Sequence, residues 1–67
     1  MTLNNLYKTE YKSAPPFIGL YKTDEKGNVD PIIPDYADEI LETHGDKEVI
    51  DHTYSTIHRC LVVELND

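Results

Sequence analysis

The side chains best suited to chemistry are three histidines, one cysteine and a neighbouring acid in the second half of the chain. These residue types bind metal ions in proteins, and they are His44, Asp51, His52, His58 and Cys60. The spacings His-x5-His and His-x-Cys match no zinc framework. On a strand, His58 and Cys60 would share one face and could touch one metal ion. They could also pair as a catalytic base and a nucleophile, but nothing in the sequence supplies an oxyanion hole or a substrate pocket. We therefore interpret these residues as packing residues and predict no metal site, no cofactor and no catalytic residue.

A group of acidic side chains shows a more regular pattern. Asp35, Asp38, Glu39 and Glu42 are spaced three and four residues apart, which places them on one stripe of a helix. Like charges at this spacing each cost an isolated helix roughly 0.2–0.5 kcal/mol. One interpretation is a solvated face that aids solubility, and the other is a row of carboxylates that binds arginine or lysine side chains. The residues predicted to bind a partner are Asp35, Asp38, Glu39, Glu42, Asp46 and Glu48.

The net charge of −7 is concentrated in one part of the chain. Residues 30–51 contain eight acidic residues against Lys47 alone, a net charge of −7, whereas residues 1–29 sum to +1 and residues 52–67 to −1. Direct binding to nucleic acid or to an anionic membrane is disfavoured, because both need a basic protein surface. The charge distribution favours a protein partner with a basic surface.

One helix is predicted in this acidic segment. Pro34 ends an extended stretch, Asp35 is a suitable N-cap, and a helix is expected from Tyr36 to His44, ended by Gly45 at the C′ position. Its apolar positions fall on one face: Ala37, Ile40, Leu41 and His44.

The remaining elements are predicted to be strands. Residues 6–12 alternate tyrosine and threonine with charged residues, and residues 17–23 form a second apolar run after two prolines. Residues 24–27 suit a type I turn with a glycine bulge, closing a hairpin onto residues 29–33. Residues 47–65 fit either two strands or a second helix, and their many β-branched residues favour strands.

Two further patterns concern the expected sheet. The tetrapeptide Leu-Tyr-Lys-Thr occurs at 6–9 and again at 20–23, which we interpret as two similar strands. Tyr7, Tyr11 and Tyr21 could line one face of the sheet, either as ordinary sheet residues or as interface residues.

Together these elements predict a single small acidic domain over residues 1–67 with an α+β fold, an antiparallel sheet of three to five strands with one short acidic helix packed on it. Cys60 is the only cysteine, so no intrachain disulfide can form. The longest apolar run, residues 60–63, is far shorter than the ~20 residues of a membrane span. The polar first residues predict no secretory leader, and a reduced, cytoplasmic setting is expected.

The function expected from these features is protein binding. The leading hypothesis is a small inhibitor or regulator that docks its acidic face on a basic, nucleic-acid-binding surface of a larger protein, where it would mimic nucleic acid. Small phage proteins that disarm host enzymes offer an analogy at this level only. The alternative is an accessory or structural subunit that associates through an apolar strand edge, including homodimer formation. A metal-dependent or thiol enzyme is the third and least supported hypothesis.

Overall fold

A computed structural model describes residues 1–11, 13, 15–29 and 31–66 of the chain. It contains two helices and four strands, in the order α1 (Leu3–Thr9), β1 (Phe17–Tyr21), β2 (Pro34–Tyr36), α2 (Ala37–His44), β3 (Glu48–Ser55) and β4 (Cys60–Asn66). Four residues lie outside the described part of the chain. They are Lys12 of the predicted first strand, Ala14 of the proline break, Asp30 of the acidic segment and Asp67 at the end of the sequence.

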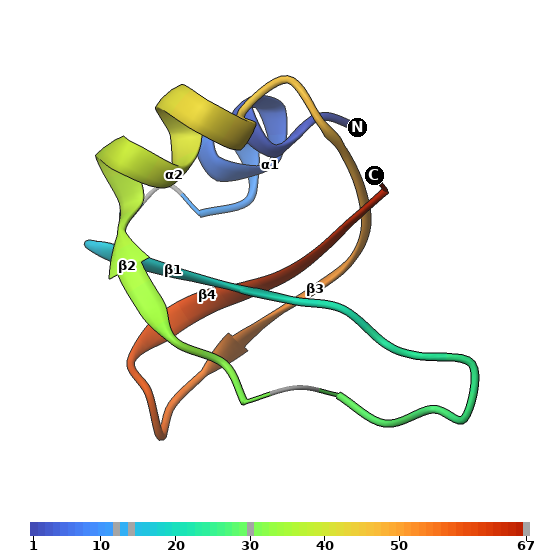
Figure 1. The fold of residues 1–67 in the computed structure, drawn as a ribbon. Helices are drawn as coiled ribbons and strands as arrows, with labels where there is room; N and C mark the ends of the chain where they lie inside the picture. The colour runs from blue at the N-terminus through green and yellow to red at the C-terminus, as the bar shows by residue number, and fades with distance from the viewer. Residues whose placement is uncertain (12, 14, 30, 67) are drawn as a thin grey trace.

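The strands form one sheet in the order β2-β1-β4-β3, and both helices lie on the same face of it (Figure 1). β1 pairs with β2 antiparallel, and β3 pairs with β4 antiparallel. The two central strands, β1 and β4, are parallel to each other, with Ile18 opposite Leu61. The α+β class is therefore confirmed, with a mixed sheet in place of a purely antiparallel one and a second helix beside the acidic one.

The first helix replaces the strand predicted over residues 6–12, and that prediction was wrong. Thr2 is the N-cap of α1, and its Oγ1 accepts a hydrogen bond from the Asn5 N–H at 3.3 Å. Leu3 and Leu6, three residues apart, are fully buried in the core. A capped helix with two buried leucines on one face is more stable here than a strand with alternating tyrosines.

The turn predicted at residues 24–27 is present. The Gly27 N–H bonds to the Asp24 carbonyl at 3.0 Å, and Gly27 has a positive φ of 83°, which glycine adopts without a steric penalty. The Asp24 carboxylate accepts from the N–H groups of Lys26 and Asn28 at 2.9 and 2.8 Å. The return strand expected after the turn is reduced to an isolated bridge between Thr23 and Val29.

The acidic helix starts one residue later than predicted and ends at the predicted glycine. Its N-cap is Tyr36, with no side-chain capping bond, because Asp35 pairs with Ile18 in the sheet. Gly45 ends the helix in a right-handed conformation with φ −60°. A Cβ on Gly45 would clash with the Leu41 carbonyl oxygen of the same helix and with the side chain of Asn4, whose N–H bonds to the Gly45 carbonyl at 3.0 Å. Glycine is favoured there because it fits both the end of α2 and the close approach of α1.

The last third of the chain forms strands, as predicted, and β4 is the most buried element. The core lies between the sheet and the helices and combines residues of α1, β1, α2 and β4. Its buried side chains are Leu3, Leu6, Ile18, Ala37, Leu61, Val63 and Leu65. Ile40 and Leu41 pack against this core from α2, so the predicted apolar face of that helix is the buried one.

Candidate functional site

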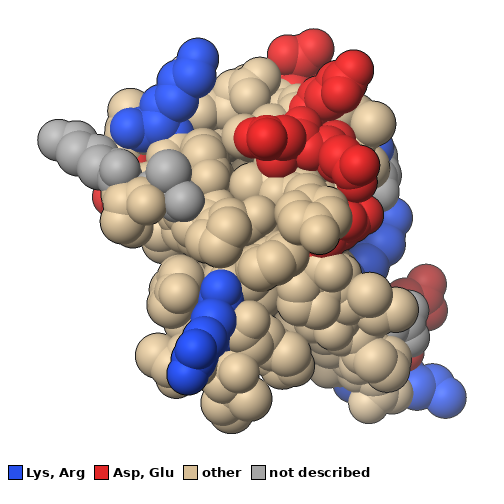
Figure 2. All heavy atoms as spheres, turned by 90° about the vertical axis from the view of Figure 1, so that its left-hand side faces the viewer, with Lys and Arg blue, Asp and Glu red and all other residues tan. Residues whose placement is uncertain are grey.

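Five of the six acidic residues predicted to bind a partner lie in or beside α2. Asp38, Glu39 and Glu42 are on the helix, Asp35 is in β2 immediately before it, and Asp46 is in the turn after it. All five are exposed. Figure 2 shows the acidic side chains gathered in one group on this side of the molecule, over the position of α2. We call these five residues the acidic surface.

The acidic surface is not a single helical stripe, because Asp35 belongs to a strand. Its Oδ1 accepts a hydrogen bond from the Tyr36 N–H at 2.8 Å. The helical neighbours that remain are Glu42 with Asp38 and Glu42 with Glu39, four and three residues apart. Asp38 and Glu39 lie in the first turn, where the helix dipole favours negative charge.

Glu48, the sixth predicted residue, already has a partner within the chain. It begins β3, and its Oε2 lies 2.7 Å from the ammonium group of Met1. Both side chains are well exposed, at 44% and 60%, so this ion pair contributes little to stability. Glu48 holds the N-terminal residues against β3, which is a different role from that of the other five acids.

None of the five carboxylates of the acidic surface forms an ion pair with any residue that the structure describes. Their negative charge is therefore not neutralised within that part of the molecule and is available to a partner. Clustered, unpaired charges of one sign raise the local potential and attract a surface of the opposite sign.

An exposed aromatic pair, which was not predicted from the sequence, includes Tyr36, the residue between Asp35 and the first residue of α2 in the chain. The rings of Phe17 and Tyr36 are 5.4 Å apart between centroids and tilted by 33°. Tyr36 is 61% exposed and Phe17 36%. The pair exists because β1 and β2 bring Phe17 opposite Tyr36, and no local sequence pattern indicates that register. Exposed aromatic rings are enriched at protein interfaces.

Backbone contacts hold this region together. The Ala37 N–H at the start of α2 bonds to the Pro16 carbonyl at 2.9 Å, just before β1. Tyr7 of α1 donates its hydroxyl to the Pro15 carbonyl. Burial raises the pKa of Tyr7, and the nearby negative charge of Asp38 raises it further. The acidic and aromatic side chains thus stand on a fixed scaffold of α1, β1, β2 and α2.

The histidines and the cysteine do not come together as a metal site. His58 lies in the turn between β3 and β4, with its Nδ1 3.1 Å from the Ser55 Oγ, whereas the side chain of Cys60 is fully buried. His52 Nδ1 lies 2.9 Å from the Tyr11 hydroxyl, and His44 Nδ1 lies 2.6 Å from the Thr43 Oγ1. The described residues contain no group of three His, Cys, Asp or Glu side chains that could hold a metal ion.

The cysteine is also not activated as a nucleophile. Burial raises the pKa of the Cys60 thiol, although a hydrogen bond with the Gly19 backbone lowers it in part. The reactive form of cysteine is the thiolate, which burial disfavours. The predicted shared face of His58 and Cys60 is not formed, because β4 begins only at Cys60.

The tyrosines considered for one sheet face are distributed over several elements. Tyr7 lies on α1 and Tyr11 follows it, so neither belongs to the sheet. Tyr21 ends β1, and its hydroxyl lies 3.4 Å from a carboxylate oxygen of Asp51 on β3. Burial raises the pKa of Tyr21, followed by the negative charges of Asp51 and Glu64.

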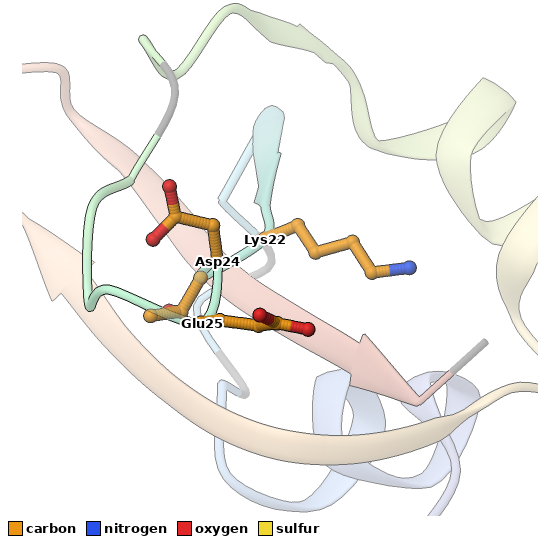
Figure 3. A pocket seen from close by; sticks show the side chains of 4 residues that line it. Lys22, Asp24 and Glu25 are labelled. Carbon is orange, nitrogen blue, oxygen red and sulfur yellow. The ribbon is translucent and has the colours of Figure 1, made fainter.

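A hollow on the surface lies in the loop after β1 (Figure 3). It is lined by Lys22, Thr23, Asp24 and Glu25, four consecutive residues of one segment. The Asp24 carboxylate is already used by the turn itself. A site that binds a small substrate brings polar groups from several elements together in a deeper cavity, and this hollow does not.

Comparison with known proteins adds no family to this description. No family model matches the chain, and neither the curated proteins nor the solved structures include a significant match. Neither of the two helices described, of seven and eight residues, is long and apolar enough to cross a membrane.

Proposed function

We propose that the chain is a small inhibitor or regulator that docks on a basic surface of a larger protein. The acidic surface and the adjacent Phe17–Tyr36 pair form the docking site. The observation that supports this proposal is the group of five exposed carboxylates without an ion pair among the described residues, beside two exposed aromatic rings.

This combination suits arginine side chains better than lysine side chains. A guanidinium group can form two parallel hydrogen bonds with a carboxylate such as Asp35 or Asp38. It can also stack its flat face on an aromatic ring such as Tyr36. Exposed aromatic rings together with a group of carboxylates would therefore give both geometric specificity and charge complementarity.

The basic surface that we favour is one that normally binds nucleic acid. Such surfaces present rows of arginine and lysine to the phosphates of the backbone. A row of carboxylates from β2 through α2 to the following turn can meet the same side chains. The chain would then act as a nucleic-acid mimic in the cytoplasm, without a cofactor and without a catalytic step of its own.

The proposal is tested by capturing a partner with two matched charge variants. Asp38→Lys with Glu42→Lys reverses charge in the acidic surface, and Glu10→Lys with Glu25→Lys does so at exposed acids elsewhere. Each double variant changes the net charge from −7 to −3, since each substitution adds two charges. The parent is immobilised, exposed to an extract of the cells that encode it, and its captured proteins are identified and bound again in purified form.

We expect the partner to be basic and to be displaced by a short DNA duplex or by increasing salt. The α2 variant should lose at least about 2 kcal/mol of binding free energy, because attraction becomes repulsion. The control variant should bind nearly as well as the parent. Tyr36→Ala should also weaken binding while the protein stays folded, because that side chain is largely exposed. Equal loss in both charge variants would show that only net charge matters, and unchanged affinity in the α2 variant would exclude this surface.

A further inference from the structure

We propose that the edge strand β3 pairs with β3 of a second copy of this chain, antiparallel and about a two-fold axis at Thr53. Two sheets of four strands would then join into one continuous sheet of eight. This inference is independent of the acidic surface, and it specifies the strand, the residues and the register of a homodimer.

β3 is a long edge strand of eight residues, and within the sheet it pairs only with β4, at the end of the strand order. Beyond Val49, no described residue outside β4 is seen to form backbone–backbone hydrogen bonds with it. The opposite edge strand, β2, has only three residues and begins with a proline, which cannot donate a backbone hydrogen bond. Natural edge strands are protected by short length, charged side chains, proline or bulges. β3 has a bulge between Val49 and Asp51, but residues 52–55 contain no lysine, arginine, acidic residue or proline.

This edge already binds an extended segment of the same chain. The Val49 N–H donates to the Met1 carbonyl at 2.9 Å, and the Leu3 N–H donates to the Lys47 carbonyl at 3.0 Å. Thr2 forms an antiparallel bridge with Glu48. The N-terminal residues thus cover the beginning of β3 up to Val49, where a bulge shifts the register, and Asp51 and the residues after it lie beyond this cover.

Beyond this cover, the backbone groups of two β3 residues face outward from the sheet. Val49, which bonds outward to Met1, lies opposite Leu65 of β4, and the ladder then pairs His52 with Val63 and Tyr54 with Leu61. Because outward and inward residues alternate along an antiparallel ladder, His52 and Tyr54 also direct their N–H and carbonyl groups outward. The His52 N–H indeed bonds to the Asp51 carboxylate at 2.9 Å rather than to β4.

A two-fold axis at Thr53 uses both outward residues. Antiparallel strands exchange hydrogen bonds between residues that both face the partner, and in this register His52 of one copy lies opposite Tyr54 of the other, and the reverse. Thr53 then lies opposite Thr53, and Asp51 lies opposite Ser55. No like charges are opposed in this register, and aromatic and threonine pairs are among those that stabilise neighbouring strands.

The side chains at this edge fit the same arrangement. His52 and Tyr54 lie on the face of the sheet that carries the helices, because their β4 partners Val63 and Leu61 are core residues. Tyr54 is 45% exposed, and His52 already contacts Tyr11 edge-to-face at 5.8 Å between centroids. In the dimer the partner's Tyr54 would extend this Tyr11–His52 pair into a three-ring cluster.

The acidic surface does not oppose this pairing. It lies in and around β2 and α2, and β2 is at the other end of the strand order from β3. The two acidic surfaces of a dimer would therefore lie at the two outer ends of the long sheet. The overall repulsion between two chains of charge −7 remains, so that salt should strengthen the dimer.

The test measures mass against concentration by sedimentation, using Thr53→Lys and a control, Thr56→Lys, in the turn after β3. We expect the parent to shift from its 7.7 kDa monomer toward twice that mass as concentration rises. Thr53→Lys places two ammonium groups opposite each other at the axis and should raise the dissociation constant at least tenfold, although it lowers the net negative charge. Thr56→Lys, with the same change in charge, should dimerise like the parent, and circular dichroism checks that both remain folded.

A cross-linking experiment tests the register separately. Facing residues of a pair without hydrogen bonds have Cα atoms about 4.5 Å apart, within the range that a disulfide spans. Thr53→Cys should therefore form an interchain disulfide under mild oxidation, whereas Thr56→Cys, in the turn after β3, should do so at least tenfold more slowly. The buried Cys60 is protected from this reaction.

Four results would overturn the proposal. The first is a parent that stays monomeric up to about 1 mM, and the second is equal dimerisation of the two lysine variants. The third is equal cross-linking of the two cysteine variants, which would exclude this register. A dimer that weakens with added salt would also contradict the proposed homodimer. Binding of the acidic surface to a basic partner should, by contrast, weaken with salt. The failure of either proposal can therefore be distinguished from the failure of the other.

Discussion

The same four residues, Leu-Tyr-Lys-Thr, form a helix in one part of this molecule and run along a strand in another. Residues 6–9 complete α1, whereas Leu20 and Tyr21 complete β1 and Lys22 and Thr23 follow it. An acidic residue comes next in both places, Glu10 in the first and Asp24 in the second. The intrinsic preferences of the two copies are therefore identical, and they do not decide the conformation.

The residues before each copy make the difference. The first copy follows Thr2, which caps the helix, and Leu3, which shares the buried face with Leu6. The second follows Pro16, which precedes the extended residues Phe17 to Gly19. Leu6 is fully buried between the helices and the sheet, whereas Leu20 is only partly buried at the margin of the core. Local capping and the available core position select the structure of an ambiguous segment.

The largest expected difference between the two copies is in their leucines. Leu6→Ala removes a fully buried side chain and should lower the free energy of unfolding by about 2–5 kcal/mol. Leu20→Ala removes a side chain that is partly exposed and should cost at most about half as much. Urea denaturation of both variants measures this. Equal losses would mean that the two copies contribute equally to the core.

The next largest effect concerns the glycine directly before the second copy. A Cβ on Gly19 would clash with Cγ2 of Ile32 and would lie 3.6 Å from the Cys60 Sγ. Gly19→Ala should therefore destabilise the protein by about 1–3 kcal/mol through overpacking. Combining it with Ile32→Ala should recover part of this loss. A double variant whose loss is the sum of the two single losses would show that Ile32 is not the obstacle.

Much of the fold could be predicted because its patterns are local. The turn at residues 24–27, the apolar face of α2 and the β-branched strands β3 and β4 each depend on nearby residues only. The strand predicted over residues 6–12 was wrong, because the alternation of Tyr7, Thr9 and Tyr11 does not reveal the Thr2 cap or the core position that Leu3 and Leu6 share. The parallel pairing of β1 with β4 joins residues about forty positions apart, and no local pattern indicates it.

The candidate site divides in the same way. Asp38, Glu39 and Glu42 could be placed on one helix from their spacing alone. Asp35 was expected to cap that helix, but the sheet takes it into β2, where it lies opposite Ile18. The Phe17–Tyr36 pair depends on the same register between β1 and β2. The pairing of β1 with β2 therefore determines both the position of Asp35 in the sheet and the formation of the Phe17–Tyr36 pair.

A smaller effect is expected from the cap that distinguishes the first copy. Thr2→Ala removes the acceptor for the Asn5 N–H and should cost about 1 kcal/mol, whereas Thr2→Ser should restore most of it. Thr23→Ala, in the second copy, should change stability by less than about 0.5 kcal/mol, because that side chain is exposed. Thermal unfolding of the three variants measures these differences. An equal loss from both alanine substitutions would show that the cap does not select the helix.

The smallest effect is expected from the tyrosines of the two copies, and it depends on pH. Burial raises the pKa values of Tyr7 and Tyr21 above the ordinary value of 10.0, with Asp38 adding to the first and Asp51 and Glu64 to the second. The folded protein thus holds these protons more strongly than the unfolded chain. The two protonated tyrosines contribute fully to stability below pH 10, the pKa of tyrosine in the unfolded chain. This contribution is lost as the pH rises through the pKa values of Tyr7 and Tyr21 in the folded protein.

Asparagine substitutions separate the two tyrosines. Asp38→Asn should lower the pKa of Tyr7 toward its ordinary value and leave Tyr21 unchanged, and Asp51→Asn should do the reverse, although Tyr21 keeps the influence of Glu64. The ultraviolet absorbance of tyrosinate, followed in Tyr7→Phe and Tyr21→Phe backgrounds, assigns each titration. Because burial is the larger cause at both positions, each pKa should remain above that of free tyrosine after its carboxylate is neutralised. A pKa that falls fully to the ordinary value would show that the carboxylate, and not burial, controls that tyrosine.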